Sequence, residues 1–358
     1  MRSKTALTVI GTLVFSSVGG SSIGVSSVGA GAARAQETNN TPIYTDPPPT
    51  TDPLPSERPF EPNPISQDFQ VGALQQDFTG DLWVGSHQGL GRVDPETGQV
   101  LARVNVPNRF IDAMVQDRVG RIWLGTYEGV VRVDPRINEI TAQNFRMPSN
   151  RVLDMVIDTR GFLWVGTDQG LVMISPDRGL LMTTVQELNG VSANALAVTP
   201  GGKLWVGTLT GIVGIDTASG FPEDQVSNLP GQSVQSMATG PNGNIWFGTP
   251  TGLYVMDGVT GRLLRSVTQM RGRSVTAMAF DQQGGLWVGT ELGLFKLDPE
   301  NGALLGEVPN LPSGHVLSIE PDTGSKIWVG TTEGLAWISE TTGLAIPHGA
   351  FTSEVGLR

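Results

Sequence analysis

Gly120-Arg-Ile-Trp-Leu-Gly-Thr-Tyr-Glu-Gly-Val130 is one of seven copies of the same short phrase in this chain of 358 residues. Each copy has a tryptophan at its centre, one glycine two residues later and a second glycine six residues later. Successive tryptophans are 40 residues apart once and 41 residues apart five times. They are Trp83, Trp123, Trp164, Trp205, Trp246, Trp287 and Trp328. A fixed period of about 40 residues is typical of a protein built from repeated supersecondary units.

Each repeat has the pattern of four short strands. The apolar residues around the tryptophan predict a strand buried on both faces, and the second glycine permits a tight turn into the next strand. Asp94-Pro-Glu-Thr-Gly98 then carries the residues of a further β-turn, a β-prone run precedes each tryptophan, and no helical pattern occurs. We therefore predict an all-β fold over residues 66–348, a seven-bladed β-propeller with four antiparallel strands per blade. The last blade is expected to supply its own fourth strand near residues 344–346.

The N-terminal region has the composition of a secretion signal followed by a linker. Arg2 and Lys4 precede an apolar run over residues 6–15, and Ala33-Arg-Ala35 fits a cleavage site, so residues 1–35 are predicted to be a signal peptide. An uncleaved N-terminal anchor is the alternative. Nine prolines between residues 36 and 65 predict a disordered linker, and residues 349–358 are expected to form a C-terminal tail.

Charge and cysteine content limit the class of function. The chain has 34 acidic and 23 basic residues, and loss of Arg2, Lys4 and Arg34 with the signal changes its net charge from −11 to −14. Nucleic acid and anionic membranes are therefore not expected partners. The absence of cysteine together with the signal favours a bacterial periplasmic or secreted protein with no stable transmembrane segment after cleavage. The three histidines are far apart and no nucleophile motif occurs, so we predict no metal, no cofactor and no catalytic residue.

Candidate ligand-binding residues lie in the irregular polar segments 13 or 14 residues before the tryptophans. Variable loops on a rigid scaffold are the usual place for a binding site, here at the mouth of the central channel. Guanidinium groups grip carboxylates and phosphates with two hydrogen bonds, so the arginines predict an anion-binding ring. Pairing with acidic residues of neighbouring loops is the alternative. The candidates are Arg109, Arg151, Arg273, His315 and Gln232.

Three other positions depart from the repeat. Tyr127 and Glu128 form the two-residue turn after a tryptophan strand, and we expect such turns to line the same face. Asp154 stands where the other repeats have alanine or serine, so it is a candidate for the site or for a structural ion pair. Trp337 lies outside the ring of tryptophans and is a candidate docking residue for a partner, unless it contacts the C-terminal tail.

The repeat resembles the two-component regulator propeller repeat. The resemblance rests on Gly-x-(Leu/Ile)-Trp-(Val/Leu/Phe)-Gly-(Thr/Ser)-x-x-Gly, preceded by Val-x-x-Met-x-x-Asp, and it covers about residues 66–348. That family supplies periplasmic ligand-sensing domains of bacterial sensor kinases, which implies an extracytoplasmic sensor or binding module. This chain has one propeller and no recognisable kinase or DNA-binding domain, which favours a free-standing binding or scaffold protein. A more distant resemblance is to the virginiamycin B lyase propeller, from which no catalytic residue is carried over.

The sequence therefore predicts a secreted or periplasmic binding module without catalytic activity, which senses or scaffolds through the channel mouth. Its expected partner is a small anionic or carbohydrate ligand, or a protein of the cell envelope. The alternative is a lyase or hydrolase at the same mouth, with His315 and either Glu333 or Glu291 as an acid–base pair. Convergence of the arginines on one face favours binding, whereas a contact between His315 and a carboxylate favours the enzyme.

Overall fold

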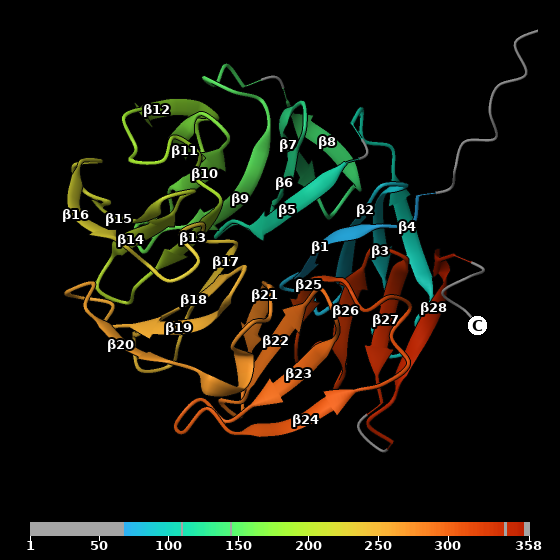
Figure 1. Ribbon diagram of the computed structural model, residues 1–358. Coiled ribbons are helices and arrows are strands. Elements are labelled where there is room, and N and C mark those ends of the chain that lie inside the picture. The colour runs from blue at the N-terminus through green and yellow to red at the C-terminus, as the bar shows by residue number, and fades with distance from the viewer. Residues whose placement is uncertain (1–67, 109, 144, 340–341, 354–358) are drawn as a thin grey trace, which may run out of the picture. The chain divides into compact units, whose positions relative to one another are not determined.

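The computed structural model describes residues 68–108, 110–143, 145–339 and 342–353, all within the compact unit Pro62–Arg358. These residues form seven four-stranded antiparallel sheets, each made of four strands that are consecutive in the sequence (Figure 1). The predicted all-β, seven-bladed propeller is therefore confirmed. The predicted signal peptide and linker lie outside the described residues. No helix of the described residues is long and apolar enough to cross a membrane.

The strands of blades 1 to 4 follow one order, from the axis outward. Blade 1 has β1 (Val71–Gln76), β2 (Leu82–Ser86), β3 (Gly89–Val93) and β4 (Val100–Val104). Blade 2 has β5 (Ile111–Gln116), β6 (Ile122–Thr126), β7 (Gly129–Asp134) and β8 (Glu139–Ala142). Blade 3 has β9 (Val152–Ile157), β10 (Leu163–Thr167), β11 (Gly170–Ser175) and β12 (Leu180–Val185). Blade 4 has β13 (Ala195–Val198), β14 (Lys203–Gly207), β15 (Gly211–Asp216) and β16 (Pro222–Ser227).

Blades 5 to 7 complete the ring. Blade 5 has β17 (Ser236–Thr239), β18 (Ile245–Thr249), β19 (Gly252–Met256) and β20 (Leu263–Ser266), followed by one 3-10 turn, η1 (Thr268–Met270). Blade 6 has β21 (Val275–Phe280), β22 (Leu286–Thr290), β23 (Leu294–Leu297) and β24 (Leu304–Val308). Blade 7 has β25 (Val316–Glu320), β26 (Ile327–Thr331), β27 (Gly334–Ile338) and β28 (Ala345–Thr352). Each innermost strand contacts the next one, and β25 contacts β1.

The tryptophans form the packing layer between the blades, as predicted. None of the seven is more than 6% exposed. In blades 1, 2, 3 and 6 the indole N–H donates to an aspartate six residues earlier, for example Trp83 to Asp77 at 2.8 Å. The other oxygen of Asp77 accepts the N–H groups of Thr79 and Asp81, so this aspartate also holds the turn between β1 and β2.

The two glycine positions of the repeat require glycine for different physical reasons. A Cβ on Gly85 would lie 2.6 Å from Ile111 of the next blade, and a Cβ on Gly330 would lie 2.4 Å from the carbonyl oxygen of Val71. The first glycine therefore lets the innermost strand of the next blade approach the tryptophan strand. The second glycine, as at Gly129 with φ 120°, has a backbone conformation that side chains disfavour, so it permits the turn.

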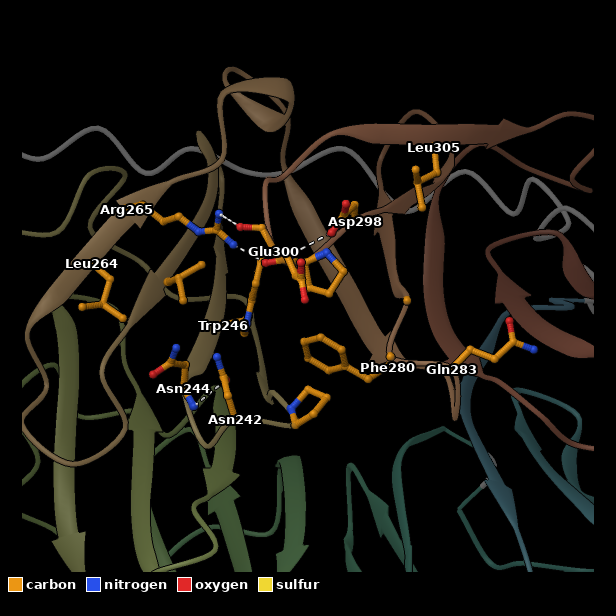
Figure 2. A pocket seen from close by; sticks show the side chains of 15 residues that line it. Asn242, Asn244, Trp246, Leu264, Arg265, Phe280, Gln283, Asp298, Glu300 and Leu305 are labelled. Atoms are coloured by element: carbon orange, nitrogen blue, oxygen red, sulfur yellow. Dashed lines mark hydrogen bonds between the residues drawn. The ribbon is translucent and has the colours of Figure 1, made fainter.

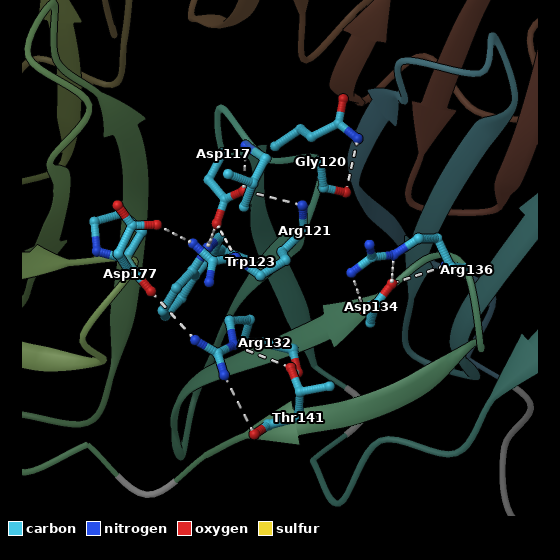
Figure 3. Close-up of polar contacts among 12 residues, drawn as sticks. Asp117, Gly120, Arg121, Trp123, Arg132, Asp134, Arg136, Thr141 and Asp177 are labelled. Atoms are coloured by element: carbon cyan, nitrogen blue, oxygen red, sulfur yellow. Dashed lines mark hydrogen bonds and ion pairs between the residues drawn. The ribbon is translucent and has the colours of Figure 1, made fainter.

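At six of the seven blade interfaces, among the described residues, a cationic side chain of one blade bonds to the main chain of the next blade. It lies over the ring tryptophan in blades 1, 2, 4, 5 and 6 and, except in blade 6, donates to a main-chain carbonyl of the following blade. Figure 3 shows blade 2, where Arg132 lies beside Trp123 and Arg121 joins Asp117 to Asp177 of blade 3. The donors and acceptors are Arg92 and Pro135, Arg132 and Pro176, Arg160 and Thr217, Lys203 and Val259, Arg265 and Pro299, and Lys326 and Pro95.

The last strand closes the ring and extends further than expected. β28 runs to Thr352, so residues 349–352 belong to blade 7 and not to the predicted tail. The reason is burial: Phe351 is 1% exposed, and its ring fills the space above Gly91 of blade 1. His348 Nε2 donates a 2.7 Å hydrogen bond to the carbonyl oxygen of Gly98. The four strands of blade 7 that the structure describes, β25 to β28, all come from its own repeat, as predicted.

Candidate functional site

One face of the propeller carries both sets of loops that the sequence singled out. We call it the inner-loop face, because the segments that lead into the innermost strands lie there. The N–H of His87 donates to the carbonyl of Gln70 at 3.0 Å, and the N–H of Thr332 donates to the carbonyl of His315 at 3.2 Å. Such bonds join the turn after a tryptophan strand to the segment before the first strand. The two sets of loops therefore lie together, as expected.

Charged and aromatic side chains of blades 1, 2 and 3 gather on this face. We call this group the blade 1–3 cluster; its members are Asp68, His87, Phe110, Asp112, Tyr127 and Arg151. His87 Nδ1 lies 2.6 Å from Asp68 Oδ2. The rings of His87 and Phe110 meet edge to face at 4.5 Å, and those of Phe110 and Tyr127 stack at 5.3 Å. The guanidinium of Arg151 lies 5.2 Å from the centre of the Tyr127 ring.

Asp112 is the half-buried acid of the blade 1–3 cluster. Burial raises its pKa above the ordinary value, although the charge of His87, a hydrogen bond from Tyr127 and the charge of Arg151 partly oppose that rise. Burial and the charge of Asp112 also raise the pKa of Tyr127. A Cβ on Gly72 would lie 2.9 Å from Asp112 Oδ1, so the glycine of blade 1 leaves the space that this carboxyl group occupies.

His87 is held in one orientation by Asp68. Burial raises the pKa of Asp68, but the hydrogen bonds from His87 and from the N–H of Gln70 outweigh it, and the net pKa is below the usual range. The His87 side chain is 7% exposed, and its Nε2 atom is buried without a hydrogen-bond partner among the described residues. Phe110 covers the imidazole. His87 therefore supports the blade 1–3 cluster from below, while the exposed surface is made by the rings and Arg151.

The predicted ring of arginines is only partly represented. Arg109 lies outside the described residues. Arg151 and Arg273 both lie on the inner-loop face, but in blades 3 and 6, and each stacks on an aromatic ring of its own surroundings; the Arg273 guanidinium is 4.5 Å from the centre of Phe295. No ion pair within the described ranges involves either arginine. The alternative of pairing with neighbouring acids is therefore not seen at Arg151 or Arg273.

The remaining candidates of this face stand apart from the blade 1–3 cluster. The imidazole of His315 makes no hydrogen bond or ion pair with any described residue, and thus contacts neither Glu333 nor Glu291. Gln232 adopts φ 57° and donates its N–H to the carbonyl of Leu229, with an exposed side chain. Glu128 is exposed, and its N–H donates to Thr126 Oγ1 at 3.1 Å.

Asp154 is part of the contact between two blades. One carboxylate oxygen accepts the N–H of Met155 and the other accepts the N–H of Leu196 in β13, each at 2.7 Å. Burial raises the pKa of Asp154 to about 7, against the opposing effect of these two hydrogen bonds. The carboxyl group therefore has a structural partner, which is a main-chain amide and not the arginine of an ion pair.

Trp337 is half-buried within blade 7. Its ring lies 5.1 Å from Lys326 Nζ, and its strand neighbours are Trp328 and Ile346. It occupies the position that holds Arg92 and Arg132 in blades 1 and 2. Contact with the C-terminal tail was the alternative to an exposed docking residue, and Trp337 packs against the buried cluster that includes Phe351. Docking through Trp337 stays a prediction.

Sequence reasoning missed Asp68 and Asp112. Asp112 lies eleven residues before its tryptophan, and it is the charged member of an otherwise uncharged series. The corresponding residues are Gly72, Leu153, Asn194, Gln235, Thr276 and Leu317. That contrast is a signal in the sequence, although it does not show the contact with blade 1. Within the described ranges, no group of three or more acidic or histidine side chains is placed to hold a metal ion.

Four segments match the model of the two component regulator propeller family: residues 105–128, 146–169, 228–251 and 269–291. The chain is also similar to the extracellular domain of a putative one component system from B. thetaiotaomicron, with a TM-score of 0.65 and 22% identity. That match covers 76% of this chain and 38% of the other, so this chain spans well under half of that relative. None of the curated proteins matches the sequence.

Two other solved structures share the propeller fold at lower identity. Virginiamycin B lyase from Staphylococcus aureus has a TM-score of 0.63 and 15% identity, over 75% of this chain and 93% of the lyase. Kuenenia stuttgartiensis hydrazine synthase has a TM-score of 0.64 and 12% identity, over 76% of this chain and 96% of that chain. At such identities the likeness concerns the fold alone.

Proposed function

We propose, on the premise that this chain is built from two component regulator propeller repeats, that it is an extracytoplasmic binding module. Its ligand is a small anion with a hydroxyl group, held by the blade 1–3 cluster on the inner-loop face. The observation that carries the proposal is Arg151, an exposed cation without an ion pair among the described residues of a strongly acidic protein.

The surroundings of Arg151 favour an anion. The guanidinium lies over Tyr127, so one face is covered by the ring, and it shares a hydrogen bond with the Tyr127 hydroxyl group while its other N–H groups have no partner among the described residues. A carboxylate or phosphate then accepts two of these N–H groups at once. Free arginine in an acidic protein is unusual, because solvated acids on neighbouring loops are its ordinary partners.

The neighbours of Arg151 suggest the rest of the ligand. Phe110 and Tyr127 are 41% and 40% exposed, and their stacked rings offer an apolar surface beside the guanidinium. The Asp112 carboxyl group is the nearby polar acceptor, already bonded by the Tyr127 hydroxyl group, and a ligand hydroxyl can donate to it. An acidic sugar, a sugar phosphate or a hydroxy acid has this combination.

Calorimetric titration with matched ligands tests the proposal. We expect residues 36–358 to bind galacturonate or glucose 6-phosphate, and to bind galactose and glucose at least about ten-fold more weakly because these lack the anion. Arg151→Ala is expected to remove the binding. Arg136→Ala is the control, since Arg136 is an exposed arginine of the β7–β8 turn, paired with Asp134. The proposal is overturned if Arg151→Ala binds as strongly as the native protein. If none of these ligands binds, a protein partner is favoured instead.

The proposed location outside the cytoplasm has its own support and test. The N-terminal composition of residues 1–35 fits a secretion signal, and one structural relative is an extracellular domain. Mass spectrometry of the protein from cell fractions distinguishes the outcomes. A periplasmic chain that begins at Gln36 supports cleavage, whereas a membrane-bound chain with residue 1 or 2 at its start supports the uncleaved anchor.

An enzyme is the second candidate, for one reason. Asp112 has a raised pKa, accepts a hydrogen bond from Tyr127 and interacts with the charge of His87, which is paired with Asp68. Such groups suit proton transfer. Mass analysis of a bound ligand after long incubation tests this idea. A product that the native protein forms and Asp112→Asn does not form supports a lyase or hydrolase. Unchanged ligand in both samples supports binding alone.

A further inference from the structure

Blades 5 and 6 enclose a groove of about 710 Å³ on the face opposite to the inner loops (Figure 2). We call it the blade 5–6 groove; the residues that matter here are Asn242, Asn244, Trp246, Phe280, Gln283 and Glu300. They come from the turns that join β17 to β18, β21 to β22 and β23 to β24, and from the tryptophan strand itself. The volume is in the range of small-molecule sites, which is about 300–1,000 Å³.

Trp246 has an indole N–H without an acceptor. The six other ring tryptophans donate theirs to an aspartate or to a main-chain carbonyl, as Trp287 does to Asp281 at 3.1 Å. Gly240 stands in blade 5 where four blades have the aspartate, and Trp246 makes no hydrogen bond with any described residue. The ring is 2% exposed and lines the groove. Because the indole nitrogen itself is not fully buried, its N–H is open to the groove, where a bound acceptor can pair with it.

The groove is open because blade 5 places its cation differently. Val255 stands where Arg92, Arg132 and Lys296 cover the tryptophan in other blades, and it is short. The cation over Trp246 is instead Arg265 of β20, at 5.3 Å from the ring centre. It donates to the carbonyl of Glu300 at 2.7 Å and to that of Pro299, which holds it at the rim.

Side-chain amides line the remaining walls. The Asn242 Oδ1 atom accepts the N–H of Asn244 at 3.1 Å, which leaves the Asn242 amide hydrogens free. The side-chain amides of Asn244 and Gln283 make no hydrogen bond with described residues. Because an amide both donates and accepts, it matches a hydroxyl group, which also does both. Figure 2 shows these amides on either side of Trp246 and Phe280.

The charge of the groove disfavours anions. Arg265 is already engaged with two carbonyl groups, and the carboxylate of Glu300 has no ion pair among the described residues. Asp298, a second acid of the lining, accepts the N–H of Glu300 at 2.8 Å. A carboxylate or phosphate group would therefore meet uncompensated negative charge here. This distinguishes the groove from the blade 1–3 cluster with its free arginine.

We propose that the blade 5–6 groove is a second ligand site, which binds an uncharged N-acetylated sugar. The acetamido carbonyl accepts the Trp246 N–H, and its methyl group lies against Phe280. The ring hydroxyls bond to Asn242, Asn244 and Gln283. A carbonyl is the stronger partner for a single fixed donor, while a hydroxyl would leave its own hydrogen facing the apolar wall.

A pair of disaccharides that differ in the acetamido group provides the test. We expect N,N′-diacetylchitobiose to bind the full propeller with a dissociation constant below about 1 mM, and cellobiose to bind at least about ten-fold more weakly. Saturation-transfer NMR on the diacetylchitobiose sample is expected to place the methyl protons closest to the protein. Equal affinity for the two sugars overturns the proposal. So does a lack of diacetylchitobiose binding at ~10 mM, a concentration well above the expected dissociation constant.

Variants of the lining locate the site. Asn244→Ala/Gln283→Ala changes only turn residues, so it is expected to fold normally and to weaken binding at least about five-fold. Gln186→Ala/Asn189→Ala removes two exposed amides between β12 and β13 and is expected to bind as the native protein does. Trp246→Phe removes the free N–H, and, where it folds, is expected to lose the preference for the acetamido sugar. Native affinity in the Asn244/Gln283 variant contradicts the proposed location.

Discussion

The ammonium group of Lys326 in the last blade donates a hydrogen bond to the carbonyl of Pro95 in the first blade. It donates a second one to the carbonyl of Glu96 at 2.7 Å, and its nitrogen lies 5.1 Å from the centre of the Trp337 ring. The same type of link joins blades 1 to 6 in series. Closure of the ring therefore uses the ordinary interface between blades, with a lysine as in blade 4, where blades 1, 2, 3 and 5 use arginine.

Replacement of Lys326 is expected to weaken closure. Lys326→Met keeps an unbranched apolar side chain at this position but loses both hydrogen bonds, which should lower the free energy of unfolding by about 1 kcal/mol. Chemical denaturation of the native and variant proteins measures this difference. Arg136→Met is the control, because it removes an exposed ion pair and should change stability by less than about 0.5 kcal/mol. Equal effects of the two substitutions would contradict a role for Lys326 in closure.

The unpaired N–H of Trp246 has a consequence for stability. Trp83→Phe removes the indole donor of the buried Asp77 Oδ2 atom, whereas Trp246→Phe leaves no described acceptor unpaired. Both substitutions lose similar apolar volume, so Trp83→Phe should cost about 1 kcal/mol more than Trp246→Phe. The comparison of the two melting curves gives the result. A larger loss for Trp246→Phe would show that its N–H has an acceptor in the folded protein.

The repeat could be predicted from the sequence because each of its fixed residues has the same structural role in every blade. The ring tryptophans pack between blades, and Gly85 and its equivalents admit the next innermost strand. Both facts follow from a residue type at a constant spacing. The number of blades, the strand order and the closure by β28 were therefore predictable, and only the end of β28 was wrong.

The cations show why other features were hidden. Arg132, Lys203 and Arg265 do the same work, yet they stand on β7, β14 and β20 at different distances from their tryptophans. A fixed register along the sequence does not align them. The blade 1–3 cluster was hidden for a related reason, since Asp112 meets Gly72 across a blade interface and 40 residues of chain.

Two acids near the propeller axis predict how stability depends on pH. Burial raises the pKa of Asp154 and that of Glu320 to about 7 each. These folded values lie above those of the unfolded chain, about 3.9 for Asp and 4.3 for Glu. Their contribution to stability is therefore fully present below pH of about 4 and is lost as the pH rises to about 7.

Asp154→Ala is expected to flatten this dependence, because alanine stands at the same position in four other blades. Both residues are half-buried by their overall exposure, so the effect of Asp154 between pH 4 and pH 8 should be on the order of 1 kcal/mol. Melting temperatures of the native and variant proteins across that range measure it. An unchanged slope in the variant means that Asp154 titrates below pH 4 in the folded state.

Gly91 and Phe351 form a contact that should behave as a unit. A Cβ on Gly91 would lie 2.5 Å from the end of the Phe351 ring, which is 1% exposed. Gly91→Ala should therefore cost about 1–3 kcal/mol through overpacking, and Phe351→Ala about 3–5 kcal/mol through the cavity. In the double variant the new methyl group enters the space that the ring has left. Its loss of stability should be smaller than the sum of the two single losses by at least about 1 kcal/mol. Additive losses in chemical denaturation would show that the ring of Phe351 does not fill the space above Gly91, and that β28 closes the propeller by its other contacts.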